Sequence, residues 1–483
     1  MNIIEALRDP NLFQPLFKDL STWTAWEVYL RALFGLGIEG ERGLKLFHDC
    51  TGLEMIPESP IKESFVIAGR RSGKSFISSV IAVFLAAFRD WRPYLAAGEK
   101  GYIFVIANDR SQARIIKDYI SGILASTPVL KAMVTSDLKE SIELKNGGVV
   151  IAVKTCSYRT LRGFTVLAAI LEELAFYRSE ESANPDREIL ASLRPALATI
   201  PESLLIGIST PYSRRGVLYD QFKRNFGKPG GPLIWKAETR VMNPTIDEET
   251  IKTAMEEDPA AARAEWLAEF REDIETYLSP EFIEAVTIPG RHELPKLDGF
   301  QYYGFIDPSG GSRDSFSLAV AHRDDNGRVI LDLIREKKPP FSPEAVVSEY
   351  AAILKGYGVL QVQSDRYAGE WPREAFRKFD ITVEPCKRTA SELYAEFLPL
   401  VTSKKVELLE NKRLLSQLTN LERRTRSGGR DLIDHPPGLH DDVSNAAAGA
   451  CVNAAIEQFV PQIWRIGGPE DTNDGWPWWA RRF

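Results

Sequence analysis

Residues 63–75 carry the pattern of a phosphate-binding loop. The apolar segment Phe65–Ala68 has the length and composition of a buried strand. A Gly-rich loop follows it, with Ala68 in place of the first Gly of the pattern. In such a loop, backbone N–H groups surround the phosphates, Lys74 reaches the β- and γ-phosphates, and Ser75 holds Mg²⁺. We therefore predict a nucleotide site made of Ala68, Gly69, Arg70, Arg71, Ser72, Gly73, Lys74 and Ser75.

A pair of glutamates, Glu172 and Glu173, follows another apolar strand pattern at 166–171. Two carboxylates at the carboxyl end of a strand, downstream of a phosphate loop, have defined roles in hydrolysis of a nucleoside triphosphate. We predict that Glu172 completes the Mg²⁺ shell and that Glu173 is the catalytic residue that polarises the attacking water. The alternative is an acidic pair in contact with solvent only.

Three aspartates in the second half of the chain predict a metal-dependent nuclease. Asp307 and Asp365 each end a strand pattern, and Asp442 opens a helix pattern. Three carboxylates can hold two Mg²⁺ or Mn²⁺ ions that clamp a phosphodiester, so no His or Lys nucleophile is required. Asp441 competes with Asp442 for the third position, and Asp314 is a candidate outer ligand. The alternative is that each strand-end aspartate forms a turn.

The surrounding segments predict how these residues are positioned. A helix with apolar residues at helical spacing begins at the phosphate loop, and further buried-strand patterns lie at 101–107 and 204–208. Alternating strands and helices imply a mainly parallel sheet with ligands at its carboxyl edge. Ser209 and Thr210, at the end of one strand, are candidates for sensing the γ-phosphate or for an ordinary turn.

The second half has its own strand order. A strand over 300–307 is followed by a hairpin with Asn326-Gly327 at its turn, since this pair suits positive φ angles. Another strand covers 359–365, and Ala and Gly in the late helix would let it lie close to the sheet. Asp on a first strand, a hairpin, Asp on a fourth strand and Asp on a late helix is the order of a ribonuclease-H-like nuclease.

Length and composition limit the classes of protein. A chain of 483 residues is expected to hold two or three domains. Its net charge of −7 does not exclude nucleic acid, because binding depends on local basic surfaces. Four scattered cysteines suggest neither a zinc site nor disulfides, and no apolar run is long enough for a membrane span. We predict domains at 1–275 and 299–457, a helical cap and linker near 244–298, and a tail at 458–483.

Several segments together resemble the ATPase of tailed-bacteriophage large terminase subunits. They are residues 69–75, 106–113, 160–163 with the Glu172-Glu173 pair, 209–211 and 266–270. The aspartate pattern resembles the nuclease of the same family, so the similarity spans nearly the whole chain. In that family the acidic pair is usually Asp-Glu, and Glu172 stands at the Asp position. The resemblance further implies that Arg162 acts as an arginine finger on a neighbouring subunit, a surface ion pair being the alternative.

The fold class implied is α/β, a P-loop NTPase with a mainly parallel sheet followed by a ribonuclease-H-like nuclease. The function implied is an ATP-driven motor that moves viral double-stranded DNA into a procapsid and an endonuclease that cuts the concatemer. The implied cofactors are ATP, Mg²⁺ for the ATPase, and Mg²⁺ or Mn²⁺ for the nuclease. The implied partners are DNA of any sequence, a portal protein, a small terminase subunit and further copies in a ring, in the host cell cytoplasm and without a membrane.

Two surface features and two alternatives complete the predictions. Arg423, Arg424, Arg426 and Arg430 are candidates for phosphate contact or form a solvated charge cluster. The Trp-containing tail is a candidate docking peptide or packs on its own chain. The first alternative function is a RuvC-like resolvase or transposase-type nuclease with a regulatory ATPase domain. The second is a non-enzymatic capsid or scaffold component.

Overall fold

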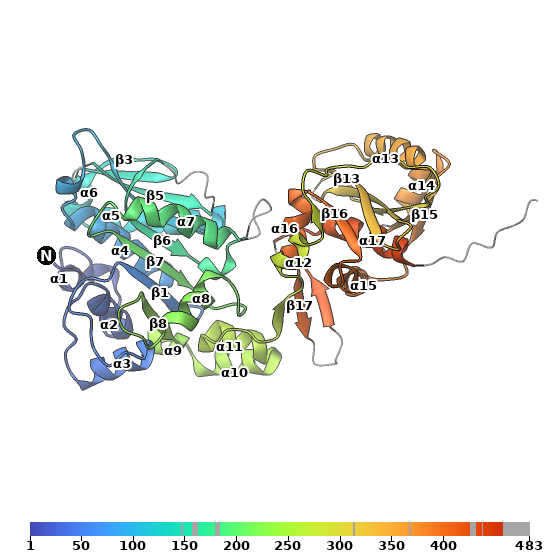
Figure 1. The fold of residues 1–483 in the computed structure, drawn as a ribbon. Helices are drawn as coiled ribbons and strands as arrows, with labels where there is room; N and C mark the ends of the chain where they lie inside the picture. The colour runs from blue at the N-terminus through green and yellow to red at the C-terminus, as the bar shows by residue number, and fades with distance from the viewer. Residues whose placement is uncertain are drawn as a thin grey trace, which may run out of the picture.

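The computed structural model describes residues 1–145, 148–156, 163–178, 184–312, 314–366, 369–425, 431–436 and 438–456. These residues form two α/β units, each built on its own large sheet, with α10 (Glu248–Glu257) and α11 (Pro259–Leu267) between them (Figure 1). The predicted α/β class is confirmed. Among the helices of the described ranges, none is long and apolar enough to cross a membrane.

The first unit contains, within the described residues, an eight-stranded sheet in the order β3-β4-β5-β2-β6-β7-β1-β8. All neighbouring strands from β5 to β8 pair in parallel, and β3 and β4 are antiparallel additions at one edge. The strands are β1 (Glu63–Ala68), β2 (Gly101–Ala107), β3 (Val134–Asp137), β4 (Ser141–Leu144), β5 (Val149–Thr155), β6 (Thr165–Glu172), β7 (Leu204–Ser209) and β8 (Leu233–Ala237). The predicted mainly parallel sheet is therefore present.

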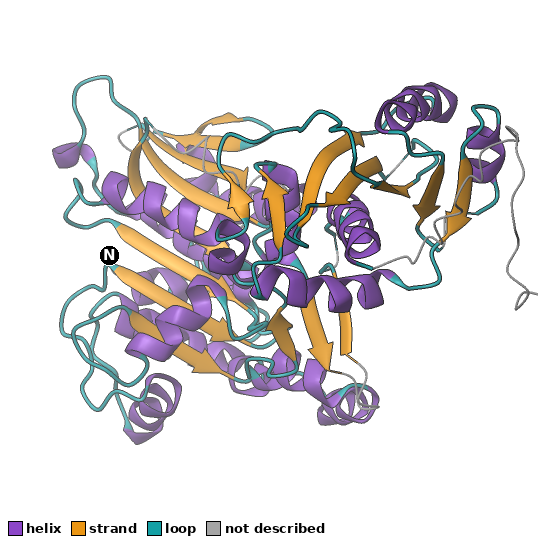
Figure 2. Cartoon of the chain, turned by 45° about the vertical axis from the view of Figure 1, so that its right-hand side comes forward, coloured by secondary structure: helices purple, strands orange, loops and turns teal. Residues whose placement is uncertain are grey.

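Helices cover both faces of this sheet (Figure 2). Alternate residues of β1 enter two separate cores, with Val66 and Ala68 in one and Phe65 and Ile67 in the other. Strands buried on both faces account for the continuous apolar runs in the sequence. The helices are α1 (Ile3–Arg8), α2 (Thr24–Leu33), α3 (Glu41–Thr51), α4 (Lys74–Phe88), α5 (Arg110–Ala125), α6 (Pro128–Met133), α7 (Pro185–Leu197), α8 (Gly216–Asn225) and α9 (Thr239–Met242).

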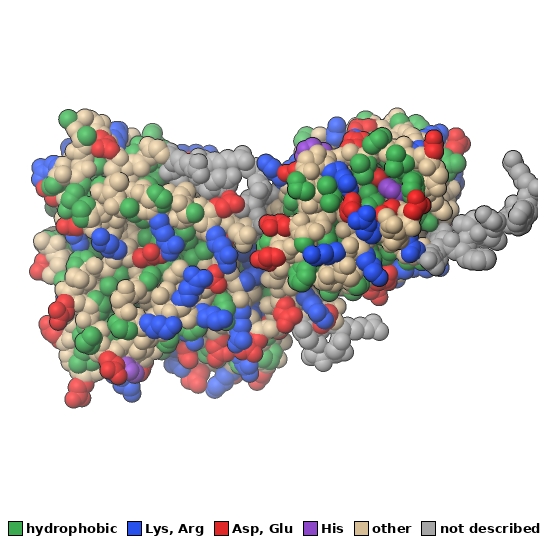
Figure 3. Space-filling model, in the orientation of Figure 1, with side chains coloured by type: hydrophobic (Ala, Val, Ile, Leu, Met, Phe, Trp, Pro, Cys, Tyr) green, Lys and Arg blue, Asp and Glu red, His purple; other side chains and the backbone are tan. Residues whose placement is uncertain are grey.

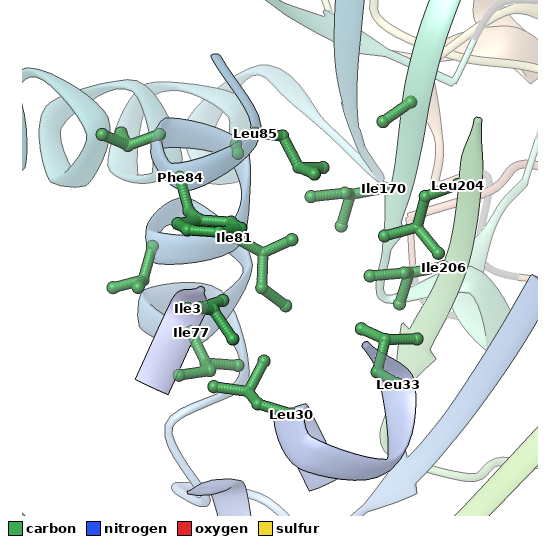
Figure 4. Close-up of a cluster of buried hydrophobic side chains, with 14 of the residues drawn as sticks. Ile3, Leu30, Leu33, Ile77, Ile81, Phe84, Leu85, Ile170, Leu204 and Ile206 are labelled. Carbon is green, nitrogen blue, oxygen red and sulfur yellow. The ribbon is translucent and has the colours of Figure 1, made fainter. Parts of the chain in front are cut away.

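The N-terminal helices belong to this core. Figure 4 shows side chains of α1 and α2 beside the apolar face of α4, with side chains of β6 and β7 on the opposite side of the cluster. These contacts hold α4 against the sheet, and α4 begins at Lys74. The N-terminal helices therefore pack against the helix that follows the phosphate loop. The labelled side chains of α1, α2, β6 and β7 are Ile3, Leu30, Leu33, Ile170, Leu204 and Ile206.

The second unit contains, in its described part, a seven-stranded sheet in the order β10-β16-β13-β12-β11-β14-β15. The central strands β11, β12 and β13 form an antiparallel meander, and β14 and β15 lie parallel to β11 on its other side. This is the strand order expected for a ribonuclease-H-like nuclease. The strands are β10 (Thr287–Ile288), β11 (Tyr302–Asp307), β12 (Phe316–Arg323), β13 (Val329–Lys337), β14 (Gln361–Ser364), β15 (Thr382–Pro385) and β16 (Val406–Leu409).

The late helix lies directly on this second sheet. It is α17 (Asp442–Ala455), and it packs across β11, β12 and β13. A Cβ at Gly449 would overlap the ring of Phe305, so the absence of a side chain allows this close approach. The other helices are α12 (Pro280–Glu284), α13 (Pro343–Tyr357), α14 (Trp371–Arg377), α15 (Ala390–Thr402) and α16 (Lys412–Asn420).

A small third sheet joins the two units. It has the order β18-β17-β9 and is formed by β9 (Ile274–Thr276), β17 (Glu422–Thr425) and β18 (Asp431–Asp434). Both β9 and β10 come from the stretch in which the sequence predicts a linker, and each pairs with strands of the second half. That stretch therefore contributes strands to the second unit.

Glu422 of β17 is a buried anion between the units, with no exposed surface. Its carboxylate accepts hydrogen bonds from Tyr212 Oη at 2.8 Å and from Arg215 at 2.7 Å, both in the first unit. Arg424 donates a further hydrogen bond at 3.1 Å. A buried charge is tolerated only when it is paired and hydrogen-bonded, so Glu422 fixes β17 to the loop that follows β7.

We expect Glu422→Ala to destabilise the contact between the units. Removing one member of a buried ion pair leaves its partner uncompensated, here Arg215, and costs about 3–5 kcal/mol. Differential scanning calorimetry should show a lower unfolding temperature. The control is Glu249→Ala, which removes an exposed partner of Lys252 and should change stability by under about 1 kcal/mol. Equal unfolding temperatures for both variants would contradict the expectation.

Candidate nucleotide and metal sites

Lys74 lies at the start of α4, immediately after Gly73, whose φ is +89°. The residue is only 6% exposed. Its Nζ donates to Thr210 Oγ1 at 2.7 Å and to the backbone oxygens of Ala68 at 3.2 Å and Gly69 at 3.1 Å. Lys74 thus donates these three hydrogen bonds to neutral oxygens, and a phosphate would supply a negative charge in addition to that of Glu173, whose Oε1 lies 3.6 Å away.

Gly69 allows the loop to approach the chain that follows β8. A Cβ at Gly69 would overlap Thr239 Oγ1 and lie 2.9 Å from the backbone oxygen of Trp266. Any side chain at this position would push the loop away from α9 and α11. Gly69 is therefore required by packing, independently of any phosphate.

Three side chains from outside the loop hold three successive loop carbonyls. Thr239 Oγ1 donates to the oxygen of Arg70 at 2.9 Å, and Asn243 Nδ2 donates to that of Arg71 at 2.8 Å. Trp26 Nε1 donates to the oxygen of Ser72 at 2.7 Å. In a trans peptide the C=O and the next N–H point in opposite directions. Holding the carbonyls outward therefore turns the following N–H groups inward, as phosphate binding requires.

Glu172 and Ser75 meet beside the loop. Ser75 Oγ donates to Glu172 Oε2 at 3.0 Å, and Glu172 is 2% exposed at the end of β6. Burial, followed by the negative charge of Glu173, raises the pKa of Glu172 to about 7. A hydroxyl and a carboxylate are oxygen donors of the kind that Mg²⁺ prefers. The pair therefore fits the predicted Mg²⁺ site.

Glu173 has an unusual backbone conformation that aims its carboxylate at the loop. Its φ of +52° is in the left-handed region, which is costly for a residue with a Cβ and is found at functional sites. Glu173 Oε2 accepts hydrogen bonds from Ser209 Oγ at 3.1 Å and from the Thr210 backbone N–H at 3.2 Å. Its Oε1 lies 3.6 Å from Lys74 Nζ. A cavity of about 350 Å³ lies beside it, lined also by Arg70 and Thr210.

Asp307 and Asp365 lie side by side at the ends of paired strands. Asp307 is the last residue of β11, and Asp365 follows β14, which pairs with β11. Asn445 of α17 lies between them, and its Nδ2 donates to Asp307 Oδ2 at 2.9 Å and to Asp365 Oδ2 at 3.2 Å. Burial and the charges of Asp442 and Asp365 raise the pKa of Asp307 well above its ordinary value.

The two aspartates at the start of α17 have different surroundings. Asp441 Oδ2 accepts a hydrogen bond from Tyr394 Oη at 2.8 Å. Asp442 Oδ2 is buried and accepts none from the described residues. The charge of Asp442 also affects Asp307 more strongly than that of Asp441 does. Asp314 lies on the solvent side, where its Oδ1 is 3.5 Å from His440 Nδ1.

The carboxylates gather without forming a closed metal cage. Within the described ranges, no three His, Cys, Asp or Glu side chains are placed closely enough to hold a metal ion. The carboxylates of Asp307 and Asp365 both lie against Asn445 Nδ2. The side chain of Asp442 would have to rotate toward them to bind the same metal ion. The donor set nevertheless fits Mg²⁺ or Mn²⁺, because carboxylate oxygens are their preferred ligands and Asp442 Oδ2 accepts no hydrogen bond from the described part of the chain that metal binding would break.

We expect the acidic cluster to make the metal-free protein more stable near pH 5 than at pH 7. Burial and the charge of Asp441 raise the pKa of Asp442 from 3.8 to about 6. The folded chain therefore binds this proton more tightly than the unfolded chain, and stability is lost as the pH rises from about 4 to about 6. Urea unfolding in EDTA should show the effect, and added Mg²⁺ should reduce it.

The control for this pH dependence is Asp442→Asn, whose amide does not titrate. The difference in stability between pH 5 and pH 7 should be smaller in the variant than in the wild type. The same difference in both proteins would show that Asp442 does not titrate in this range.

Three arginines line a cleft between the units. They are Arg178, Arg271 and Arg424. Figure 3 shows many Lys and Arg side chains on this face of the first unit, several of them beside the boundary with the second. Of the four arginines predicted to contact phosphate or to form a charge cluster, Arg423 pairs with Asp431 and Arg424 pairs with Glu422. Arg424 thus contributes to the cleft while it neutralises Glu422.

Some predictions concern residues outside the described ranges. These are Arg162, Arg426 and Arg430, and the tail at 458–483.

Solved structures similar to this chain are phage large terminases. The HK97 bacteriophage large terminase is 14% identical over 81% of this chain and 91% of its own, with a TM-score of 0.37. The Thermus phage P74-26 large terminase ATPase domain is 21% identical over 50% of this chain and 97% of its own, with a TM-score of 0.36. The large terminase nuclease of thermophilic phage G20c with bound magnesium is 17% identical over 36% of this chain and 95% of its own, with a TM-score of 0.31. No family model and no curated protein matches the chain.

Proposed function

We propose that this chain is a large terminase subunit. It is an ATP-driven motor that moves viral double-stranded DNA into a procapsid, and an endonuclease that cuts the concatemer. One observation carries the proposal: two separate groups of acids lie at the carboxyl edges of two separate sheets. Glu172 and Glu173 stand beside Lys74 in the first unit, and Asp307 and Asp365 stand together in the second. The first unit is the proposed ATPase domain, and the second unit is the proposed nuclease domain.

In the ATPase site, Lys74 exchanges Thr210 and the loop oxygens for the β- and γ-phosphates. Mg²⁺, held by Ser75 and Glu172, would neutralise charge that develops on the phosphates. Glu173 lies at the cavity beside Lys74 and orients the attacking water. Arg162 completes the site on a neighbouring subunit's nucleotide.

In the nuclease site, Asp307, Asp365 and Asp442 would hold the metal ions, and Asp441 would keep its hydrogen bond from Tyr394. Two bound Mg²⁺ or Mn²⁺ ions would activate a water and stabilise the leaving oxygen. Asp314 acts as an outer ligand at the solvent side. The cleavage reaction then needs no His or Lys nucleophile.

The loop that follows β7 connects the nucleotide site to the second unit. Thr210 of this loop contacts both Lys74 and Glu173, and Tyr212, two residues later, contacts Glu422 of β17. A change at Thr210 on hydrolysis would thus reach the second unit through the hydrogen bonds that Tyr212 and Arg215 of this loop donate to Glu422. Such a path is what conversion of hydrolysis into movement of DNA requires.

The arginines of the cleft would contact DNA phosphates without reading the base sequence. Binding should therefore weaken steeply as salt is raised. The motor would act as a ring of copies on a portal protein, with a small terminase subunit presenting the DNA, in the host cell cytoplasm.

The test is DNA packaging in vitro. The purified chain, procapsids, linear double-stranded DNA and ATP are mixed, and DNA protected from an added nuclease is measured. ATP-dependent protection is expected, and it should disappear when procapsids or ATP are omitted. DNA-stimulated ATP hydrolysis without protected DNA would contradict the proposal and favour a nuclease with a regulatory ATPase.

A further inference from the structure

Asn445 is buried in the centre of the acidic cluster of the second unit. It is 3% exposed and lies three residues after Asp442, on the same face of α17. Its Nδ2 donates to one oxygen of Asp307 and one of Asp365. Its Oδ1 is buried and receives no hydrogen bond from the described residues. A buried acceptor without a partner costs about 1–3 kcal/mol, so this orientation of the amide is only half satisfied.

The amide NH₂ occupies the position that a cation between Asp307 and Asp365 would take. An NH₂ group carries two donors, and here they join two carboxylates that would otherwise repel each other. A divalent cation binds carboxylate oxygens at roughly 2.0–2.6 Å. The N–H groups and the cation cannot both lie between the same two oxygens.

A half-turn of the side-chain amide resolves this conflict. The final torsion of Asn is broad and roughly two-fold, so rotation exchanges Nδ2 and Oδ1 with little movement of α17. The helix itself is held by the contact of Gly449 with Phe305. After rotation, Oδ1 faces the cation and gains the partner that it lacks.

We propose that Asn445 is a two-state ligand of the nuclease centre. In the metal-free protein its NH₂ group holds Asp307 and Asp365 together, and in the loaded protein its Oδ1 binds the metal ion. The inference rests on the proposed nuclease function. It also gives a reason for an amide at this position, since a carboxylate would add a further buried charge to the metal-free cluster.

Mn²⁺ binding to the full chain tests the inference. Isothermal titration calorimetry is done without nucleotide, and the heat that Asp307→Asn abolishes is assigned to this site. Asn445→Ala removes the ligand oxygen and should weaken Mn²⁺ binding by about 10–100-fold. The matched control is Asn453→Ala, which removes another buried amide of α17 and should leave the affinity unchanged.

Asn445→Asp provides a second readout that does not depend on activity. It keeps an oxygen at the position but removes the donors, so the metal-free melting temperature should fall below that of the wild type. Saturating Mn²⁺ should then raise the melting temperature of this variant by more than it raises that of the wild type.

Three outcomes would overturn the inference. Unchanged or tighter Mn²⁺ binding by Asn445→Ala would show that the amide only holds Asp307 and Asp365 together and does not bind the metal ion. Weaker Mn²⁺ binding by folded Asn445→Asp would show that no oxygen is needed there. Absence of Mn²⁺ binding by the wild type would overturn the proposed nuclease centre together with the inference, whereas the first two outcomes leave that centre standing.

Discussion

Lys74→Ala is expected to lower ATP hydrolysis by about 10³-fold or more and to leave metal-dependent cutting of plasmid DNA measurable. Lys74 is the buried cation of the loop, and it lies within reach of both Thr210 and Glu173. A positive charge that stabilises the transferring phosphoryl group is worth about 10³–10⁵ in rate. Release of inorganic phosphate and nicking of supercoiled plasmid with Mn²⁺ would be measured on the same preparation.

The control for Lys74→Ala is Lys117→Ala. Lys117 is another buried lysine of the first unit, and it pairs with Asp137 and Ser121, neither of which lines the nucleotide site. Its loss should lower stability without a comparable loss of hydrolysis. Loss of both activities in a folded Lys74→Ala protein would show that the two units do not hold independent sites.

Asp365→Ala is expected to abolish cleavage and to spare ATP hydrolysis. The substitution removes one of two carboxylates that converge on Asn445, and with it a metal ligand. Metal stabilisation of the transition state is worth several kcal/mol, and each factor of ten in rate corresponds to about 1.36 kcal/mol. The expected loss is therefore about 10³-fold or more in the rate of plasmid linearisation.

Asp380→Ala is the control for this second experiment, because Asp380 is an exposed aspartate of the same unit with a side chain that is 92% accessible. Its removal should change neither activity. Cleavage retained by purified Asp365→Ala would place the nuclease site elsewhere on the chain or assign it to a contaminant.

The sequence was sufficient to predict the strands and turns that have strong local patterns. The apolar segment at 101–107 coincides with β2, and the Asn326-Gly327 turn lies between β12 and β13 with a φ of +77° at Gly327. A strand buried on both faces must be apolar throughout, and a tight hairpin needs a residue that tolerates positive φ. Such constraints act within a few residues and are therefore visible in sequence.

Other elements depend on contacts between distant residues. The sheet β18-β17-β9 pairs segments from both sides of the second unit's main sheet in sequence, and its short strands are polar. The phosphate loop has three anchors, the side chains that donate hydrogen bonds to its carbonyl groups. Trp26 precedes the loop in the chain, and Thr239 and Asn243 follow it. No local pattern marks these residues, because their function exists only after folding.

The predictions of the two sites also differ in whether they depend on a local pattern or on contacts between distant residues. Phosphate-loop chemistry is encoded in one continuous segment, whereas the gathering of Asp307 and Asp365 follows from strand order. Asn445 was missed, although its spacing of three residues from Asp442 on a helix places both on one face and was a usable signal. The absence of a closed metal cage within the described residues depends on side-chain orientation, which sequence does not specify.

The anchoring of the phosphate loop also has a consequence for synthesis on the ribosome. Trp26 leaves the ribosome before the loop, but Thr239 lies 169 residues after Arg70 in the chain. At roughly 5–20 residues per second, this interval is about 8–34 s. During that time the nascent chain has only one of the three anchors, so a competent nucleotide site arises late in translation.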